Sequence, residues 1–428
     1  MKQEIKQRIE QIKNGEVPQG YKKTKIGIVP NEWEEIKFDT LFESLSEYTD
    51  DLGKYKLYSL TIEDGVVEKD ERYERSHLVK KENSYKIIPS NYFAYNPMNV
   101  RFGAVARNKS NKDGAISGYY DIFTTKNEFD LEFMDNFLVS SKMINYYNMV
   151  STGSLIEKQR VHFSQFINFQ IPLPNSNERK KISEILSTQD KVIELKEKLL
   201  KEKEKQKKYL MQNLLTGRKR LKGFNGEWKK VKLGEICNYN RGITYSKNDE
   251  NTINGYKVLR ANNISTSTNS LNFDDVKMIS KNVKVKDIHK LKENDILICS
   301  ASGSKDHVGK VAYISNDMDY YYGGFMAAIR TICDDILSKY LFYFFTSEYF
   351  NYYLNLSLGT TTINNLNSAI VLNCIIPLPH IEEQKAIAEI LTTADKELKL
   401  LQEELEEEKR KKKALMQLLL AGIVRVKV

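Results

Sequence analysis

One stretch of the sequence approaches a known catalytic motif. Asn96-Pro97-Met98-Asn99 is close to the Asn-Pro-Pro-aromatic motif of amino-methyltransferases. Met98, however, replaces the second proline, and no glycine-rich cofactor loop follows a predicted strand. We therefore expect no methyl-transfer site at this position.

A second stretch, which ends at Lys310, approaches a phosphate-binding loop. The interval between Gly303 and Gly309 is one residue too long for that motif, and Val311 stands where Ser or Thr would hold magnesium. We interpret this stretch as a basic loop rather than a nucleotide site.

The histidines and cysteines show no spacing typical of metal ligands or of a disulfide framework. Scattered cysteines of this kind are usually buried thiols. The sequence therefore predicts neither a zinc site nor a nuclease centre. The residues concerned are His77, His162, His289, His307, His380, Cys237, Cys299, Cys333 and Cys374.

Basic and amide side chains gather in several segments and have the chemistry to bind nucleic acid. Arg forks onto guanine O6 and N7, Asn or Gln onto adenine N6 and N7, and further cations hold phosphates. Exposed loop polarity would explain the same residues, so both interpretations stay open here. The candidates are Arg101, Arg107, Asn108, Lys109, Lys158, Gln159, Arg160 and His162 in the first half, and Arg241, Tyr245, Lys247, Arg260, Asn262, Asn263, Lys305, Lys310, Asn364 and Asn365 in the second.

The composition is that of a globular protein. Of 428 residues, 41% are hydrophobic and 29% charged, which allows two or three domains with cores of their own. A net charge of +9 fits an anionic partner without requiring one. The N-terminus has no apolar core of signal-peptide type, and no apolar run reaches about eighteen residues. We expect a cytoplasmic protein that does not contact membranes.

An internal repeat indicates the elements that must position these side chains. Ile171-Pro172-Leu173-Pro174 returns 205 positions later as Ile376-Pro377-Leu378-Pro379. The two copies run without a gap to Lys222 and Lys427, with roughly half of their positions identical. Segments kept alike in a repeat are scaffold, and segments that differ are where the halves do different jobs. The candidate DNA-binding residues lie in the differing segments.

Each copy carries apolar residues in alternating steps of four and three, which keeps one seam of a helix facing a partner. At ~1.5 Å per residue, about forty residues form a helix roughly 60 Å long, which needs a partner. We expect the copies to pair as an antiparallel coiled coil; packing of each helix only on its neighbouring domain is the alternative. Lys196, Lys203 and Lys207 interrupt the first seam, a hint that other helices join. The predicted pairing residues are Ile182, Leu186, Ile193, Leu200, Leu210, Leu214, Ile387, Leu391, Leu398, Leu401, Leu405, Leu415 and Leu419.

The segments around these helices are repeated as well. A tryptophan-containing entry occurs at Trp33 and again at Trp228, and aromatic helical segments end near Gly153 and Gly359. Alternating β-branched runs between entry and exit predict strands. The sequence therefore predicts an α+β protein with an internal pseudo-two-fold axis, in which two globular domains alternate with two long helices. The expected segments are 1–24 (charged N-terminus), 25–174 (first domain), 175–217 (first long helix), 218–379 (second domain) and 380–428 (second long helix and C-terminal tail).

Over nearly its full length this layout resembles the DNA-specificity (S) subunits of Type I restriction-modification systems. The hallmark of that family is a Pro-Leu-Pro turn followed by a Glu/Gln-rich helix start, here Pro377-Leu378-Pro379 and then Glu383-Gln384. The first copy has Arg179 where the second has Gln384, a departure that we do not expect to disturb the helix.

The resemblance implies a noncatalytic subunit with two target-recognition domains, each of which reads one half of an asymmetric, bipartite DNA sequence. The paired helices would set the unread spacer; half-sites one turn of duplex apart lie about 34–36 Å from centre to centre. The implied partners are double-stranded DNA, two modification subunits that carry S-adenosylmethionine and methylate adenine, and restriction subunits that use ATP and magnesium. The chain itself would hold no cofactor or metal.

Two other functions remain as alternatives. A self-sufficient methyltransferase-nuclease would need cofactor motifs, which the sequence lacks. A coiled-coil scaffold that binds only proteins would show no DNA affinity, whereas a DNA reader loses affinity steeply as salt rises.

Overall fold

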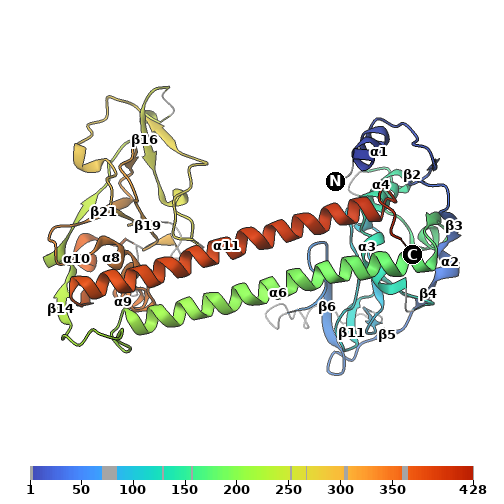
Figure 1. The fold of residues 1–428 in the computed structure, drawn as a ribbon, viewed down its shortest axis with the longest axis horizontal. Coiled ribbons are helices and arrows are strands. Elements are labelled where there is room, and N and C mark those ends of the chain that lie inside the picture. The colour runs from blue at the N-terminus through green and yellow to red at the C-terminus, as the bar shows by residue number, and fades with distance from the viewer. Residues whose placement is uncertain are drawn as a thin grey trace. The chain divides into compact units, whose positions relative to one another are not determined.

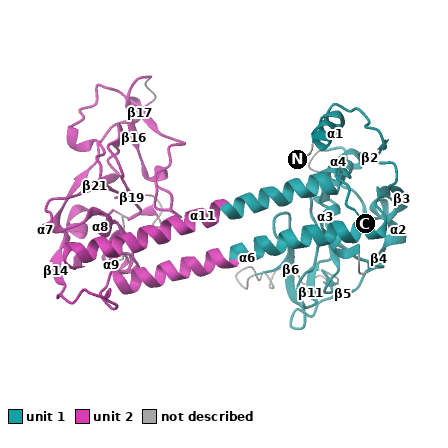
Figure 2. Ribbon diagram, viewed as in Figure 1, with its two compact units in different colours: residues 1–197, 404–428 teal, residues 198–403 magenta. Residues whose placement is uncertain are grey.

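The computed structural model describes residues 3–69, 84–127, 130–155, 158–250, 253–266, 268–302, 307–358 and 365–427 (Figure 1). They form two compact units: unit 1 comprises residues 1–197 and 404–428, and unit 2 comprises residues 198–403 (Figure 2). Each unit contains sheets, short helices and a part of each of two long helices. The predicted α+β class, with two sheet-rich domains and two long helices, is confirmed.

The long helices are α6 (Ser176–Leu214) and α11 (Ile381–Leu419). Inside unit 1, Asp190 of α6 pairs with Lys412 of α11 at 2.5 Å, and inside unit 2, Lys207 pairs with Asp395 at 2.5 Å. As the residue number increases along α6, the number of its partner in α11 decreases. The predicted antiparallel pairing of the two helices is confirmed.

The apolar seam is buried most deeply where the helices meet the domain cores. Ile182 and Leu186 share the core of unit 1 with Leu419, while Ile387 and Leu391 share the core of unit 2 with Leu214. In each unit, the start of one long helix therefore packs both on the domain core and on the end of the other long helix. The half-buried seam positions are Ile193, Leu200, Leu210, Leu398, Leu401 and Leu415, and Leu405 is buried.

The lysines that interrupt the first seam are matched by carboxylates on the other helix. Lys196 pairs with Glu404 at 2.6 Å in unit 1, and Lys203 pairs with Glu397 at 2.6 Å in unit 2. The side chains of these lysines are only about a quarter exposed (24% and 29%). Their aliphatic stems cover the seam while the charged ends are paired, so the interruption does not by itself require additional helices.

Unit 1 contains two larger sheets. The first has the strand order β10-β9-β12-β4, the second β5-β8-β11-β6-β7, and the two-stranded ladders are β1-β2 and β13-β3. The strands are β1 Tyr21–Thr24, β2 Gly27–Pro30, β3 Glu34–Lys37, β4 Phe42–Leu45, β5 Tyr48–Thr49, β6 Lys56–Thr61, β7 Gly65–Glu68, β8 Tyr85–Ile88, β9 Phe93–Tyr95, β10 Val105–Arg107, β11 Gly114–Ser117, β12 Asp121–Thr125 and β13 Gln170–Leu173. The helices are α1 Gln3–Lys13, α2 Phe38–Leu41, α3 Leu131–Phe137, α4 Ser141–Val150 and α5 Phe163–Phe166, with a 3-10 turn η2 at Val100–Phe102.

Unit 2 has a four-stranded sheet β15-β21-β18-β19, a three-stranded sheet β17-β16-β20 and the ladder β14-β22. Its strands are β14 Lys229–Lys232, β15 Cys237–Arg241, β16 Tyr256–Leu259, β17 Lys277–Ile279, β18 Ile296–Cys299, β19 Val311–Tyr313, β20 Tyr321–Tyr322, β21 Met326–Thr331 and β22 Ile375–Leu378. The helices are α7 Leu233–Ile236, α8 Ser338–Phe345, α9 Glu348–Leu358 and α10 Ser368–Leu372, with 3-10 turns η5 Lys247–Asp249, η6 Ala261–Asn263 and η7 Asp287–His289.

The internal repeat is visible in the frame of each unit. In both, a ladder (β3-β13 or β14-β22) is followed by a short helix (α2 or α7) and a four-stranded sheet with matching order, β4-β12-β9-β10 in unit 1 and β15-β21-β18-β19 in unit 2. The remaining sheet differs, because unit 1 has five strands there and unit 2 has three. The difference between the halves is therefore concentrated in the second sheet and its loops.

The exchange of Gln384 for Arg179 at the helix start leaves the local structure intact. Arg179 donates to the carbonyl of Pro174 and to the Asp130 carboxylate, at 2.8 and 2.6 Å. Gln384 donates to the carbonyls of Pro379 and Asp335, at 2.9 and 2.7 Å. Asp130 and Asp335 are 205 positions apart, as the repeat requires. Two different side chains therefore hold the same loop against the same helix start, as expected.

Each long helix ends in a tail that clamps the start of the other long helix. In unit 1, Arg425 grips Glu178 with two bonds of 2.6 and 2.8 Å, and the Glu178 side chain is only 2% exposed. In unit 2, Arg220 grips Glu383 with two bonds of 2.7 Å, and Glu383 is also 2% exposed. The two arginines are 205 positions apart in the sequence, and so are the two glutamates. The bond to Glu178 raises the pKa of Arg425 further above its ordinary value.

No helix within the described part of the chain is long and apolar enough to cross a membrane.

Candidate nucleic-acid interface

Unit 2 has a cleft of about 750 Å³ that gathers five of the residues selected from the sequence. The cleft lies where β15, β16 and β21 end or begin, so its walls are held by sheet edges rather than by free loops. Ile243, Thr244, His307, Gly323, Gly324 and Phe325 also line it. The five gathered residues are Arg241, Tyr245, Lys247, Arg260 and Asn262.

A close backbone crossing shapes the floor of this cleft. A side chain at Gly242 would place its Cβ 2.2 Å from the carbonyl oxygen of Gly323, so only glycine fits there. The Gly242 amide donates to the Met326 carbonyl at 2.9 Å, and the Ile243 amide donates to the Tyr322 carbonyl at 2.9 Å. The segment after β15 is thereby fixed against the turn between β20 and β21.

The cations of the cleft differ in how they are held. Arg241 is exposed and donates from Nε to the carbonyl of Gly324 at 2.9 Å, which fixes the plane of its guanidinium. Arg260 pairs with Asp275 at 2.7 Å, and Asn262 donates to the same carboxylate at 3.0 Å. Among the described residues Arg241 has no carboxylate partner. Its fork is therefore suited to bind an outside acceptor.

Tyr245 and Lys247 complete the polar wall. Partial burial raises the pKa of the Tyr245 hydroxyl, so this group stays protonated and able to donate a hydrogen bond at neutral pH. Lys247 lies on the turn η5 and is exposed.

Asn263 does not face the cleft, although the sequence placed it among the candidates. Its side chain is fully buried (0% exposed); its amide donates to the carbonyls of Asn272 and Asp275, and its Oδ1 accepts from the Arg260 amide at 2.9 Å. The side chain cannot reach a duplex in this conformation. In this conformation Asn263 holds the turn that presents Asn262.

The other second-half candidates lie at the rim or outside the described residues. Lys310 is half-buried beside β19, and the exposed Asn365 bridges by its backbone to Ala301, which lines the cleft. Lys305 and Asn364 lie outside the described residues.

Unit 1 has a smaller cleft of about 450 Å³ that contains two of its candidates, Arg107 and Lys109. Arg107 forms a two-pronged ion pair with Asp135, and its other arm donates to Asn91 at 2.8 Å. Lys109 pairs with the same Asp135 at 3.2 Å. Since the Asp135 side chain is only 8% exposed, Arg107 is committed to an internal contact.

Asn108 is a second candidate whose side chain is turned to the interior. It is fully buried, its amide donates to the carbonyls of Ile88, Pro89 and Lys112, and its Oδ1 accepts from the Ser110 hydroxyl at 2.7 Å. A polar side chain satisfied in this way stabilises a loop. Asn108, like Asn263, is thus engaged in internal hydrogen bonds.

The remaining first-half candidates form a separate group near η2. Arg101 is largely buried and donates to the Gln159 side chain at 3.3 Å. Lys158 and His162 are exposed, and Arg160 is half-buried and bridges by its backbone to Thr152. Of this group, only Lys158 and His162 are exposed to solvent.

The stretch that approached a methyltransferase motif has a structural role. Asn96 is 7% exposed, and its Oδ1 accepts hydrogen bonds from the amides of Met98 and Asn99, which closes the turn before η2. No cluster of three metal-ligating side chains occurs among the residues that the structure describes.

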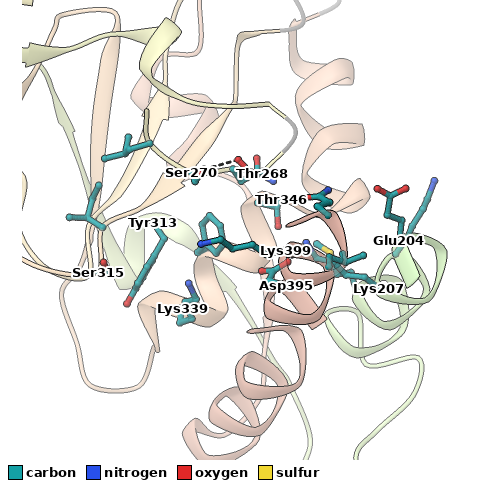
Figure 3. Close-up of a pocket in the computed structure, with 18 of the residues that line it drawn as sticks. Glu204, Lys207, Thr268, Ser270, Tyr313, Ser315, Lys339, Thr346, Asp395 and Lys399 are labelled. Atoms are coloured by element: carbon teal, nitrogen blue, oxygen red, sulfur yellow. Dashed lines mark hydrogen bonds and ion pairs between the residues drawn. The ribbon is translucent and has the colours of Figure 1, made fainter. Parts of the chain in front are cut away.

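A second, larger cleft of unit 2, about 1070 Å³, lies along the long helices (Figure 3). Lys339 stands over the ring of Tyr313, with Nζ 3.9 Å from the ring centre, and burial lowers the pKa of Lys339. Lys207 pairs with Asp395, and Lys208 with Glu348 at 2.5 Å. Because carboxylates balance most of its lysines, this cleft is less suited than the first to a polyanion.

Comparison with known proteins gives the class of the fold. A structure reported for complex assembly and conformational transition of the type I R-M system matches with a TM-score of 0.58 at 19% identity, covering 92% of this chain and 99% of that one. The Type I restriction-modification S subunit from M. genitalium matches with a TM-score of 0.54 at 14% identity, covering 90% and 96%. Both likenesses establish the fold.

Sequence similarity to known proteins covers part of the chain. The "Type I restriction modification DNA specificity domain" matches residues 225–409. The MjaVIII specificity subunit of Methanocaldococcus jannaschii is 32% identical over 277 residues, which are 61% of this chain and 64% of that subunit. The match thus spans less than two thirds of the relative's length. Residues 225–409 thus match a Type I DNA specificity domain, and over 61% of its length the chain is similar in sequence to a Type I specificity subunit.

Sequence reasoning missed two parts of this arrangement. Phe325, which lines the unit 2 cleft, is 69% exposed, and nothing in its sequence context distinguishes it from a core aromatic. The Arg220–Glu383 and Arg425–Glu178 clamps had a signal, because all four residues recur at the repeat interval.

Proposed function

We propose that this chain is a noncatalytic DNA-reading subunit, in which the unit 2 cleft reads one half of a bipartite target and unit 1 reads the other. The observation that carries the proposal is the convergence of Arg241, Tyr245, Lys247, Arg260 and Asn262 on one cleft. Arginine and amide side chains on fixed sheet ends suit base edges, and the flanking cations suit phosphates.

The proposal assigns all chemistry to partners. Modification subunits would carry S-adenosylmethionine, restriction subunits would use ATP and magnesium, and the chain would supply the target sequence. The sequence similarity to Type I specificity domains and subunits supports this division of labour.

Two modification subunits are favoured by a pair of equivalent surface leucines. Leu195 on α6 and Leu400 on α11 are 205 positions apart and are 53% and 59% exposed. Apolar side chains exposed at the same place in each repeat suit two copies of one partner. We expect Leu195→Glu and Leu400→Glu each to remove one copy from the purified complex, measured by native mass spectrometry. A complex with unchanged stoichiometry in both variants would contradict this assignment.

The test of DNA reading is a binding and methylation assay on the full chain with its modification subunit. We expect affinity for duplex DNA to fall steeply between low and physiological salt, because phosphate contacts release counterions. We expect adenine methylation only when this chain and the modification subunit are both present. Methylation by the chain alone would favour a self-sufficient methyltransferase, and absence of DNA binding by the complex would favour a protein scaffold.

A further inference from the structure

We infer that Phe325 is a specificity-determining residue that contacts the C5-methyl group of a thymine in the half-site read by unit 2. The inference deepens the proposed function and rests on it. The exposure of the Phe325 side chain, its fixed backbone and the neighbouring residues of the cleft all favour an apolar contact with a bound ligand.

The first observation is where this exposed ring lies. Phe325 is 69% exposed, and isolated exposed aromatics are common on proteins, as Tyr352 on α9 shows at 67%. Phe325 differs because it lines the cleft that holds Arg241, Arg260 and Asn262. The carboxylate of the same cleft, Glu250, is paired with Lys277 at 2.9 Å. An exposed aromatic ring beside arginines and an amide suits a ligand that combines charge with apolar surface, and DNA bases in a groove do so.

The second observation is that the backbone beneath the ring is fixed. The Phe325 carbonyl accepts from the amides of Ser300 and Ala301, at 2.8 and 3.1 Å, and the next amide, of Met326, donates to Gly323 at 2.8 Å. The turn is therefore tied to β18 as well as to itself. A side chain on such a turn is presented in one place and loses little backbone freedom on binding.

The third observation is the direct link to the arginine of the cleft. Arg241 donates from Nε to the carbonyl of Gly324, the residue before Phe325. The guanidinium and the ring are thus anchored to the same turn and would approach the same few base pairs. In the major groove the apolar feature of a base pair is the thymine methyl, and Phe is among the side chains that contact it.

The experiment uses the full chain in complex with its modification subunit and duplexes that carry the methylated target. Each thymine of the unit 2 half-site is replaced in turn by deoxyuridine, which removes only the methyl group. Wild type and Phe325→Ala are compared on the full set. We expect one deoxyuridine to weaken binding by wild type about fourfold, the value of one buried methyl. We expect the same replacement to leave binding by Phe325→Ala unchanged.

Tyr352→Ala is the matched control, because it removes an aromatic ring of similar exposure outside the cleft. It is expected to behave as wild type on every duplex. Complex assembly and the thermal unfolding midpoint are measured for each variant, and a 69% exposed ring is expected to alter neither.

The outcomes separate the inference from the proposed function. The methyl contact is refuted if no deoxyuridine replacement weakens binding by wild type. It is also refuted if the loss of affinity from wild type to Phe325→Ala is as large on the deoxyuridine duplex as on the thymine duplex; a stacking role then remains. If Phe325→Ala binds every duplex as wild type does, Phe325 is no part of the interface. If wild type itself binds a shuffled duplex as tightly as the target, it is the proposed DNA reading that fails.

Discussion

Units 1 and 2 share a frame, but Arg107 in the unit 1 cleft and Arg241 in the unit 2 cleft are held in opposite ways. In unit 1, the buried Asp135 neutralises both Arg107 and Lys109. In unit 2, Arg241 is anchored only through Nε to a backbone carbonyl and has no carboxylate partner among the described residues. A committed arginine stabilises its own domain, whereas an anchored arginine with an open fork is prepared for a ligand.

The difference shows that the repeated frame does not dictate the reading surface. The four-stranded sheets have matching strand order, and the helix starts are held by equivalent contacts. The second sheets have five and three strands, and the clefts beside them hold different side chains. A chain built in this way can change what one unit binds without disturbing the frame of the other.

The largest effect is expected where the units are most alike, at the two clamps. Arg425→Ala leaves the buried Glu178 carboxylate without its main partner, and we expect the unfolding free energy to fall by about 2–3 kcal/mol. Arg220→Ala is expected to act in the same direction through Glu383. Denaturant unfolding measures both, with the exposed Arg410→Ala on α11 as control. If only one clamp variant is destabilised, the frames are not energetically equivalent.

A smaller effect is expected where the units differ. Arg241→Ala should weaken binding of the complex to its target by about 1–3 kcal/mol without altering stability, because the side chain has no internal ion pair among the described residues. Arg107→Ala should instead lower stability, because it leaves Asp135 buried with Lys109 alone. Titration of target DNA together with denaturant unfolding distinguishes the two. If both variants lost DNA affinity equally and kept their stability, the proposed difference between Arg107 and Arg241 would be contradicted.

The smallest effect concerns Lys142, which matches Glu348 in the repeat and has a different task. Its Nζ donates to the carbonyls of Ile28 and Ala421, and burial lowers its pKa from 10.5 to about 8. Between these values the unfolded chain binds more protons here than the folded chain, so the unfolding free energy should rise with pH across this window. Compared with Lys142→Met, the rise should be about 1–2 kcal/mol, measured by denaturant unfolding from pH 7 to 10. Parallel pH profiles of the two proteins would contradict it.

The frame could be predicted from the sequence because its information is repeated. The copy of Ile171–Pro174 at Ile376–Pro379 marks both helix starts, and the four-three seam predicts the pairing that the ion pairs between α6 and α11 confirm. The burial of Lys196 and Lys203 beside carboxylates was not predicted, since a heptad pattern shows that a position is polar and not which group will pair with it.

The candidate site could be predicted only in part, because residue type does not reveal burial. Asn108 and Asn262 look alike in sequence, yet one is enclosed by backbone carbonyls and the other lines a cleft. Phe325 was missed for the converse reason: an aromatic residue beside a strand of alanines and an isoleucine is expected in the core. Loop conformation decides both cases.

The central claim is that each unit reads its own half of one target. It is tested most directly by sequencing the methylome of cells in which residues 30–170 are exchanged for the corresponding domain of another family member, with the modification subunit present. We expect one half of the methylated sequence to change and the half read by unit 2 to stay as it was. A change in both halves, or in neither, would contradict it.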